Sequence, residues 1–114
     1  MADLAFNITK SIFTAIRNGE TGGTFNVNGR TVPTDGYFVG GVVPSLINPT
    51  PAQVLAFIET VGTDYVGFWE DSETLALYID AVDHVRTPEA AERLSKLRSE
   101  IAYWDVANAS EVRV

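Results

Sequence analysis

Residues 65–82 read YVGFWEDSETLALYIDAV and decide the fold expected for this chain. Two runs rich in aromatic and aliphatic residues surround a short polar stretch, which is the pattern of two strands joined as a β-hairpin. A two-residue turn would set Glu70 directly opposite Glu73, and like charges in that position destabilise a strand pair. We therefore predict a four-residue loop over 70–73, which places Trp69 opposite Thr74.

This register predicts two different faces for the hairpin. One face is apolar, with Phe68 opposite Leu75, and the other carries Tyr and Trp side chains, which are enriched at protein interfaces. An acidic tip lies beside the aromatic face, so we interpret the hairpin as a binding surface on which aromatics anchor a basic partner and acids steer it. The alternative is that a helix covers the aromatic face and leaves the acids as a solvated loop. The candidate binding residues are Tyr65, Trp69, Glu70, Asp71, Glu73 and Tyr78.

Three helices are predicted from capping patterns and apolar periodicity. The clearest begins at Thr50, with Pro51 at its first helical position and Gln53 completing a capping box with Thr50. The helices are expected at 8–18 behind a cap at Asn7, at 51–61, and from Thr87-Pro88-Glu89 onward.

Short strands and turns account for most of the remaining sequence. Asn28-Gly29 between two extended runs is the strongest short hairpin signal, because both turn residues must take positive φ angles. Further strands are expected at 24–27, 30–32, 37–43, 65–69, 74–82, 101–106 and 111–114. The hairpins predict an α+β fold, an antiparallel or mixed sheet with about three helices packed mainly on one face. No linker or repeat is visible, so residues 1–114 are interpreted as a single domain.

The net charge of −7 over 114 residues is unevenly distributed. Residues 1–50 and 86–114 each carry as many bases as acids, whereas residues 51–85 carry seven acids and no base. The acidic balance argues against direct binding of nucleic acid or of an anionic membrane, which both need a basic surface. The acidic segment instead predicts a basic macromolecule as partner.

Few residues of catalytic or metal-binding type are present. The chain has no Cys and a single histidine, His84, so thiol chemistry is excluded and a zinc site is disfavoured. Asp80 and Asp83 together with His84 could hold a hard divalent cation, or they could be the polar end of a strand. We expect no cofactor and no catalytic residue, because an exposed acidic turn does not raise a carboxyl pKa for acid–base work. No signal peptide or membrane-spanning run is visible, which predicts a cytoplasmic protein.

A second candidate site lies in the segment Gly36–Ser45. Aromatic side chains beside flexible glycines can line a groove for a nucleotide or another small ligand, with backbone amides as donors. The alternative is a bulged strand whose glycines let a helix pack closely. The candidate ligand-binding residues are Tyr37, Phe38, Gly40 and Gly41.

Two stretches carry a resemblance to a known group of proteins. They are DGYFVGG at 35–41 and EIAYWDVAN at 100–108, the latter followed by EVRV at 111–114 and supported by YVGFW at 65–69 and YID at 78–80. The chain resembles small orphan proteins of actinobacteria and especially of their phages. The resemblance implies a phage or mobile-element accessory protein in the host cytoplasm, and it assigns no activity to any residue.

Two functions are therefore carried forward. The first is a non-enzymatic accessory protein that binds and modulates a host protein with a basic surface through the acidic, aromatic hairpin. The second is a protein that binds or sequesters a nucleotide-like ligand at Gly36–Ser45.

Overall fold

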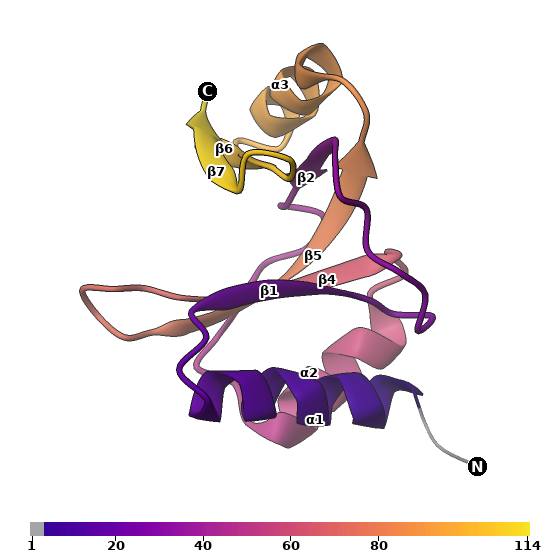
Figure 1. The fold of residues 1–114 in the computed structure, drawn as a ribbon, viewed down its shortest axis with the longest axis vertical. Helices are drawn as coiled ribbons and strands as arrows, with labels where there is room; N and C mark the ends of the chain where they lie inside the picture. Colours follow the sequence, from indigo (N-terminus) through magenta and orange to yellow (C-terminus); the bar gives the residue numbers. More distant parts are fainter. Residues whose placement is uncertain (1–3) are drawn as a thin grey trace.

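The computed structural model describes residues 4–114, and Figure 1 shows how its helices and strands are arranged. The helices are α1 (Leu4–Arg17), α2 (Pro51–Thr60) and α3 (Pro88–Leu97). The strands are β1 (Gly22–Asn26), β2 (Tyr37–Val39), β3 (Leu46–Ile47), β4 (Tyr65–Glu70), β5 (Leu77–Val85), β6 (Ala102–Asp105) and β7 (Ser110–Arg113). They form one antiparallel sheet in the order β1-β4-β5-β2-β6-β7, with the short β3 beside β5. The predicted α+β class is confirmed.

The capping residues place the starts of two helices as the sequence predicts. Thr50 Oγ1 accepts a hydrogen bond from the backbone N of Gln53 at 3.2 Å, and the Gln53 side chain accepts one from the N of Thr50 at 2.9 Å. Thr87 caps α3 in a related way, by accepting from the N of Ala90 at 3.1 Å. These side-chain bonds satisfy backbone donors that a helix start leaves without partners.

The first helix begins earlier than predicted. It starts at Leu4, so Asn7 lies inside the helix and is not its cap. The apolar stripe explains the difference, because Ala5 precedes Ile8 and Ile12 at helical spacing and is buried with them. Burial of Ala5 together with this stripe therefore favours one further helical turn at the N-terminal end of α1.

The sheet folds over along β5, its longest strand. The first part of β5 pairs with β4 and β3, while Asp83–Val85 pair with β2. Figure 1 shows the result as layers, with α1 and α2 below β1 and β4, and with α3 above β2, β6 and β7. α1 and α2 pack on one half of the sheet around a core that includes Ile12, Val66 and Ile79. All three helices lie on the outer face of the folded sheet. The two halves of its inner face therefore lie opposite each other.

The central hairpin has a different register from the predicted one. Trp69 lies opposite Tyr78, not Thr74, and the connection runs over 71–76. A compact turn stabilises this longer loop, because Asp71 Oδ1 accepts from the backbone N of Glu73 at 2.7 Å and of Thr74 at 3.1 Å. The shift is an even number of residues, so the residues of β4 and β5 keep the faces that the sequence predicted. The predicted pairing of Phe68 with Leu75 is wrong, because Phe68 lies opposite Ile79 and Leu75 lies exposed in the loop.

Two other strand predictions are wrong. A turn forms at Asn28-Gly29, where Gly29 has a φ of 73°, but residues 30–32 form no strand. β1 pairs with β4 instead, since β4 brings apolar side chains to the same core. The strand expected over 37–43 ends at Val39, because the chain leaves β5 at Gly40 and returns to it only at β3.

Candidate binding cleft

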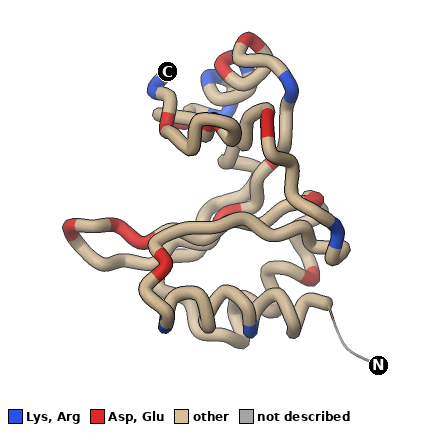
Figure 2. The backbone as a smooth tube through the Cα atoms, in the orientation of Figure 1, with Lys and Arg blue, Asp and Glu red and all other residues tan. Residues whose placement is uncertain are grey.

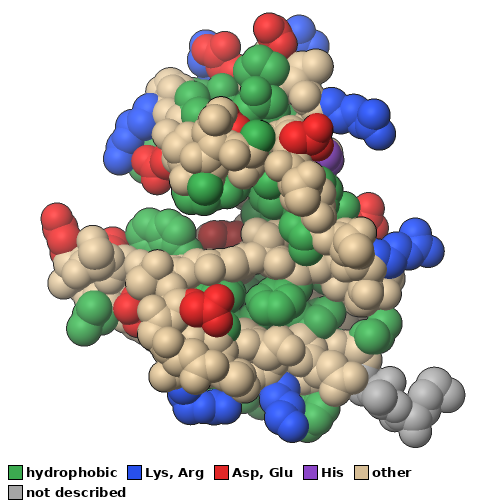
Figure 3. All heavy atoms as spheres, viewed as in Figure 1, with side chains coloured by type: hydrophobic (Ala, Val, Ile, Leu, Met, Phe, Trp, Pro, Cys, Tyr) green, Lys and Arg blue, Asp and Glu red, His purple; other side chains and the backbone are tan. Residues whose placement is uncertain are grey.

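The inner face of the folded sheet encloses a cleft of about 410 Å³. Residues of β1, β4 and β5 line one side of it, and residues of β2, β6 and β7 line the other. Figure 3 shows this hollow between the two halves of the molecule, with hydrophobic side chains at its rim and acidic atoms in its depth. The cleft is thus produced by the fold of the sheet along β5.

The floor of the cleft is a row of three residues across neighbouring strands. Gly67 of β4 lies between Thr24 of β1 and Asp80 of β5. Because Gly67 has no side chain, bare backbone forms the floor, and a Cβ there would lie 3.4 Å from the carbonyl oxygen of Gly23. The hydroxyl of Ser45 donates a hydrogen bond to Asp80 at the end of the row.

Two half-exposed tryptophans stand on opposite sides of the cleft. Trp69 of β4 is 44% exposed and meets Tyr78 edge to face, with ring centroids 5.0 Å apart. Trp104 of β6 is 43% exposed and lies opposite Phe38 of β2 and Glu111 of β7 in the sheet register. Trp side chains left half-exposed around a hollow provide apolar contact area that no other part of the protein covers.

Two carboxyl groups in the cleft are held in surroundings that disfavour their charge. Burial raises the pKa of Asp80, and the hydrogen bond from Ser45 opposes that shift. Burial also raises the pKa of Glu100, the negative charge of Asp80 raises it further, and Arg98 opposes the shift. Both carboxyl groups line the cleft, so an ionised Asp80 opposes the ionisation of Glu100.

Glycines admit the Glu100 side chain to this position. A Cβ on Gly40 would lie 2.9 Å from Glu100 Oε1, and one on Gly41 would lie 3.0 Å from its Cδ. Gly41 also has a φ of 80°, which L side chains rarely adopt. The alternative interpretation of Gly40 and Gly41 was that they let a helix pack closely. They admit instead the connection between α3 and β6.

Arg98, the basic side chain whose charge acts on Glu100, is already engaged. Arg98 Nη2 lies 2.6 Å from Asp83 Oδ2, and its Nη1 donates to the carbonyl oxygen of Gly40 at 3.1 Å. No Lys or Arg is among the described residues that line the cleft, whereas Asp80, Glu100 and Glu111 are. The cleft is therefore acidic and aromatic.

The possible cation site of Asp80, Asp83 and His84 does not come together. Asp80 binds Ser45, Asp83 binds Arg98, and the His84 ring nitrogen Nε2 contacts the carbonyl oxygen of Asp35 at 2.8 Å. Asp80 and Asp83 also lie on opposite faces of β5, since they are three residues apart along a strand. Within residues 4–114, no three His, Cys, Asp or Glu side chains form a group able to hold a metal ion.

The hairpin candidates are divided between three places. Trp69 lines the cleft and Tyr78 supports its ring, whereas Tyr65 packs on Phe38 at 5.4 Å between ring centroids and does not line the cleft. The other three candidates, Glu70, Asp71 and Glu73, lie at the end of β4 and in the loop that follows it. No helix covers the aromatic face within the described residues, so that alternative is wrong.

The second candidate site meets the first across the cleft. Phe38 and Gly40 line the cleft, opposite Trp69. Tyr37 instead contacts Tyr103 edge to face at 5.5 Å, and Gly41 lies against Glu100 and Arg98. Two segments that the sequence suggested as alternative sites thus contribute to one hollow.

The acidic segment of the sequence is not one acidic patch. Figure 2 shows its acids spread over the molecule, from the projecting β4–β5 loop to α2. Asp64 and Glu70 flank opposite ends of β4, about 20 Å apart at the rise of a strand. Asp83 is neutralised by Arg98. The acids of functional interest are therefore the loop acids and Asp80, which Glu100 joins in the cleft.

Sequence reasoning missed Trp104, Glu100 and Glu111 as site residues. They belong to the C-terminal segment, whose charges balance and which carries no motif of known chemistry. The pairing of β2 with β6 brings them to the cleft. The exposure of Trp104, which is high for a Trp side chain, becomes visible only in the structure.

Comparison with family models, with curated proteins and with solved structures finds no match to this chain. No helix within residues 4–114 has the length and apolar character needed to cross a membrane. The chemistry of the cleft is therefore the basis for assigning a function.

Proposed function

We propose that this protein is a non-enzymatic binding protein that receives a basic side chain of a macromolecular partner in its cleft. The supporting observation is the composition of the cleft, in which Trp69 and Trp104 face a hollow lined by Asp80 and Glu100 and by no Lys or Arg among the described residues. This chemistry fits a guanidinium group, which is flat, stacks on aromatic faces and forms charge-assisted hydrogen bonds with carboxylates.

The raised pKa values of the two carboxyls favour a cationic ligand. Burial makes both Asp80 and Glu100 costly to ionise in the free protein, and the charge of Asp80 adds to that cost at Glu100. A bound cation relieves the repulsion and is itself recognised by the carboxylates. Glu70 at the end of β4 and Glu73 on the exposed loop that follows add a field that steers a basic partner toward the cleft.

The nucleotide alternative has weaker support. A phosphate in the cleft would face Asp80, Glu100 and Glu111, and no basic side chain lining it would compensate that repulsion. The phage context and the host cytoplasm, which rest on the sequence resemblance, stay predictions.

A matched pair of peptides tests the proposal. The probes are acetyl-Thr-Arg-Thr-Arg-Thr-amide and the same peptide with citrulline, a neutral analogue of similar shape, in place of each arginine. Binding is measured by calorimetry and by fluorescence, since the two Trp residues of the chain are Trp69 and Trp104. We expect the arginine peptide to bind at least about tenfold more tightly, because charge-assisted hydrogen bonds are lost with citrulline.

Variants of the protein locate the site. Asp80→Asn combined with Glu100→Gln should remove the preference for arginine, and Trp104→Ala should weaken binding of the arginine peptide. Glu59→Gln, which neutralises an exposed acid on α2 outside the cleft, is the matched control and should leave binding unchanged. Equal binding of the two peptides contradicts the proposal, and so does an arginine preference that survives in the double variant.

A further inference from the structure

The free edge of β1 is the feature on which this inference rests. Glu70 N donates to Thr21 O at 2.9 Å and Val27 N donates to Asp64 O at 2.8 Å, at the two ends of the β1–β4 pair. Hydrogen-bonded and non-hydrogen-bonded pairs alternate along an antiparallel ladder. The N–H and C=O groups of Gly22 and Thr24 therefore point away from β4, toward an edge where no further strand is found within residues 4–114.

This edge lacks the devices that usually prevent strand addition. β1 reads GGTFN, with no charged residue and no proline, and both of its glycines are exposed. The opposite outer strand, β7, carries Glu111 and Arg113, which form an ion pair at 3.3 Å. β1 is thus the open edge of the sheet.

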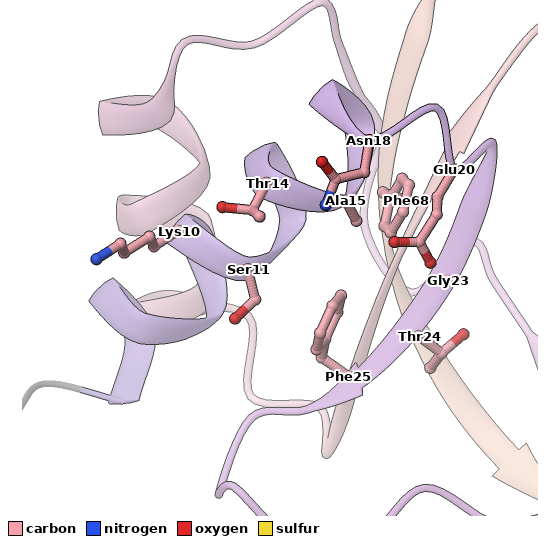
Figure 4. Close-up of a pocket in the computed structure, with 10 residues that line it drawn as sticks. All are labelled: Lys10, Ser11, Thr14, Ala15, Asn18, Glu20, Gly23, Thr24, Phe25 and Phe68. Carbon is pink, nitrogen blue, oxygen red and sulfur yellow. The ribbon is translucent and has the colours of Figure 1, made fainter.

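Hollows lie on both sides of this edge. On one side is the cleft, whose lining includes Gly22, Gly23 and Thr24. On the other side is a hollow of about 510 Å³ between β1 and the α1 residues Ser11, Thr14 and Asn18. Figure 4 shows Phe25 pointing from β1 toward α1, while Thr24 points to the opposite side. Alternate side chains of an added strand would enter these two spaces.

We propose that β1 receives an extended segment of the basic partner as an added antiparallel strand, with a basic residue at every second position. The inference rests on the proposed function and adds the conformation and direction of the bound segment. Charge complementarity selects this occupant, because Asp80, Glu100 and Glu111 line the cleft side. Hydrogen bonds of the main chain then supply affinity, and the side chains in the cleft supply specificity.

The geometry determines which backbone N–H groups of the added segment form hydrogen bonds with β1. Residues directly opposite Gly22 and Thr24 exchange both hydrogen bonds with them in an antiparallel pair. Their side chains lie on the same face of the sheet as that of Thr24, which is the cleft face. The basic residues are therefore the residues whose N–H groups bond to β1, and the residues between them point their N–H groups outward.

Two N-methylated peptides test this requirement. In acetyl-Thr-Arg-Thr-Arg-Thr-amide, one version is N-methylated at both Arg residues and the other at the second and third Thr residues, so charge and side chains are identical. We expect methylation at Arg to weaken binding by about tenfold or more, because it removes bonds to β1 and places a methyl group against the edge. Methylation at Thr should change the affinity by no more than about threefold, which is under 1 kcal/mol.

A pair of protein variants tests the same edge. Thr24→Pro removes the free N–H while leaving the bonds to β4, and Thr24→Val keeps the N–H and the side-chain shape. We expect Thr24→Pro to lose affinity for the unmodified peptide and Thr24→Val to retain it. If Thr24→Pro does not fold, the two methylated peptides decide the question by themselves.

Failure of this inference is distinguishable from failure of the proposed function. If arginine and citrulline peptides bind equally, the proposed function fails. If arginine is preferred but both methylated peptides bind equally, only strand addition is overturned, and stronger loss on Thr methylation overturns the antiparallel direction. A dimer of the protein alone, detected by sedimentation and abolished in Thr24→Pro, would assign the edge to a second copy and overturn the partner segment.

Discussion

Substituting the two adjacent glycines of β1 by alanine should have different effects on stability, with a clear loss at Gly23 and none at Gly22. A Cβ on Gly23 would lie 2.8 Å from Phe68 Cε1, a separation that real Cβ atoms essentially never show. The Phe68 ring has little freedom to move, since it is 3% exposed and stacks on Phe25 with centroids 6.4 Å apart. A Cβ on Gly22 would meet only the carbonyl oxygen of Phe68, at 3.4 Å.

The expected magnitudes follow from these contacts. Overpacking a core position costs about 1–3 kcal/mol, and replacing Gly by Ala in the unfolded chain offsets about 0.4–1 kcal/mol of that cost. Gly23→Ala should therefore lower the free energy of unfolding by about 1–2 kcal/mol, which corresponds to about 4–8 °C in Tm for a domain of this size. Gly22→Ala should be neutral or stabilising by less than about 1 kcal/mol.

Thermal and urea unfolding followed by circular dichroism measure both variants. The pair reports on the register of β1, because a shift by one residue would turn Gly22 toward Phe68 and Gly23 toward the cleft. A larger loss for Gly22→Ala than for Gly23→Ala would refute the register, and with it the assignment of the edge groups of Gly22 and Thr24.

Two further substitutions test buried polar groups. Burial raises the pKa of Asp80, so its contribution to stability increases as the pH falls from neutral through this raised pKa toward the ordinary value of 3.8. Asp80→Asn should be more stable than the parent protein at neutral pH, and that advantage should shrink on acidification. A difference in Tm that is constant with pH would contradict this. Ser95 is fully buried in α3, and its Oγ has no hydrogen-bond partner within the described residues. Because a buried hydroxyl without a partner costs about 1–3 kcal/mol, Ser95→Ala should unfold at an equal or higher urea concentration, and a clear decrease would indicate an undetected partner.

Local chemistry explains the successful sequence predictions. The starts of α2 and α3 follow from Thr50 and Thr87, whose hydroxyls bond to backbone groups three residues away, and nothing distant is needed. The strands of the central hairpin were likewise found from their aromatic and aliphatic residues. Within β4 and β5 the predicted faces were correct even though the register was not, because an even shift preserves the alternation.

The wrong predictions share a dependence on partners far away in the sequence. The Asn28-Gly29 turn forms, yet the strand that pairs with β1 is β4, some forty residues later. The loop after Glu70 is longer than predicted, because Asp71 organises it through backbone bonds to Glu73 and Thr74. Repulsion between Glu70 and Glu73 argued against a two-residue turn, but it did not distinguish a four-residue loop from a longer one.

The sequence by itself determined the α+β class, two helix starts, the aromatic face of the hairpin and the absence of thiol chemistry. These properties follow from capping groups, alternation and composition, which act over a few residues. Only the tertiary structure decided where the charge is concentrated, since the acidic segment 51–85 is divided over the molecule. It also joined Trp104 and Glu100 to Trp69 and Asp80, because the long strand β5 pairs with β4 along one part and with β2 along another, and the sheet closes over its own inner face.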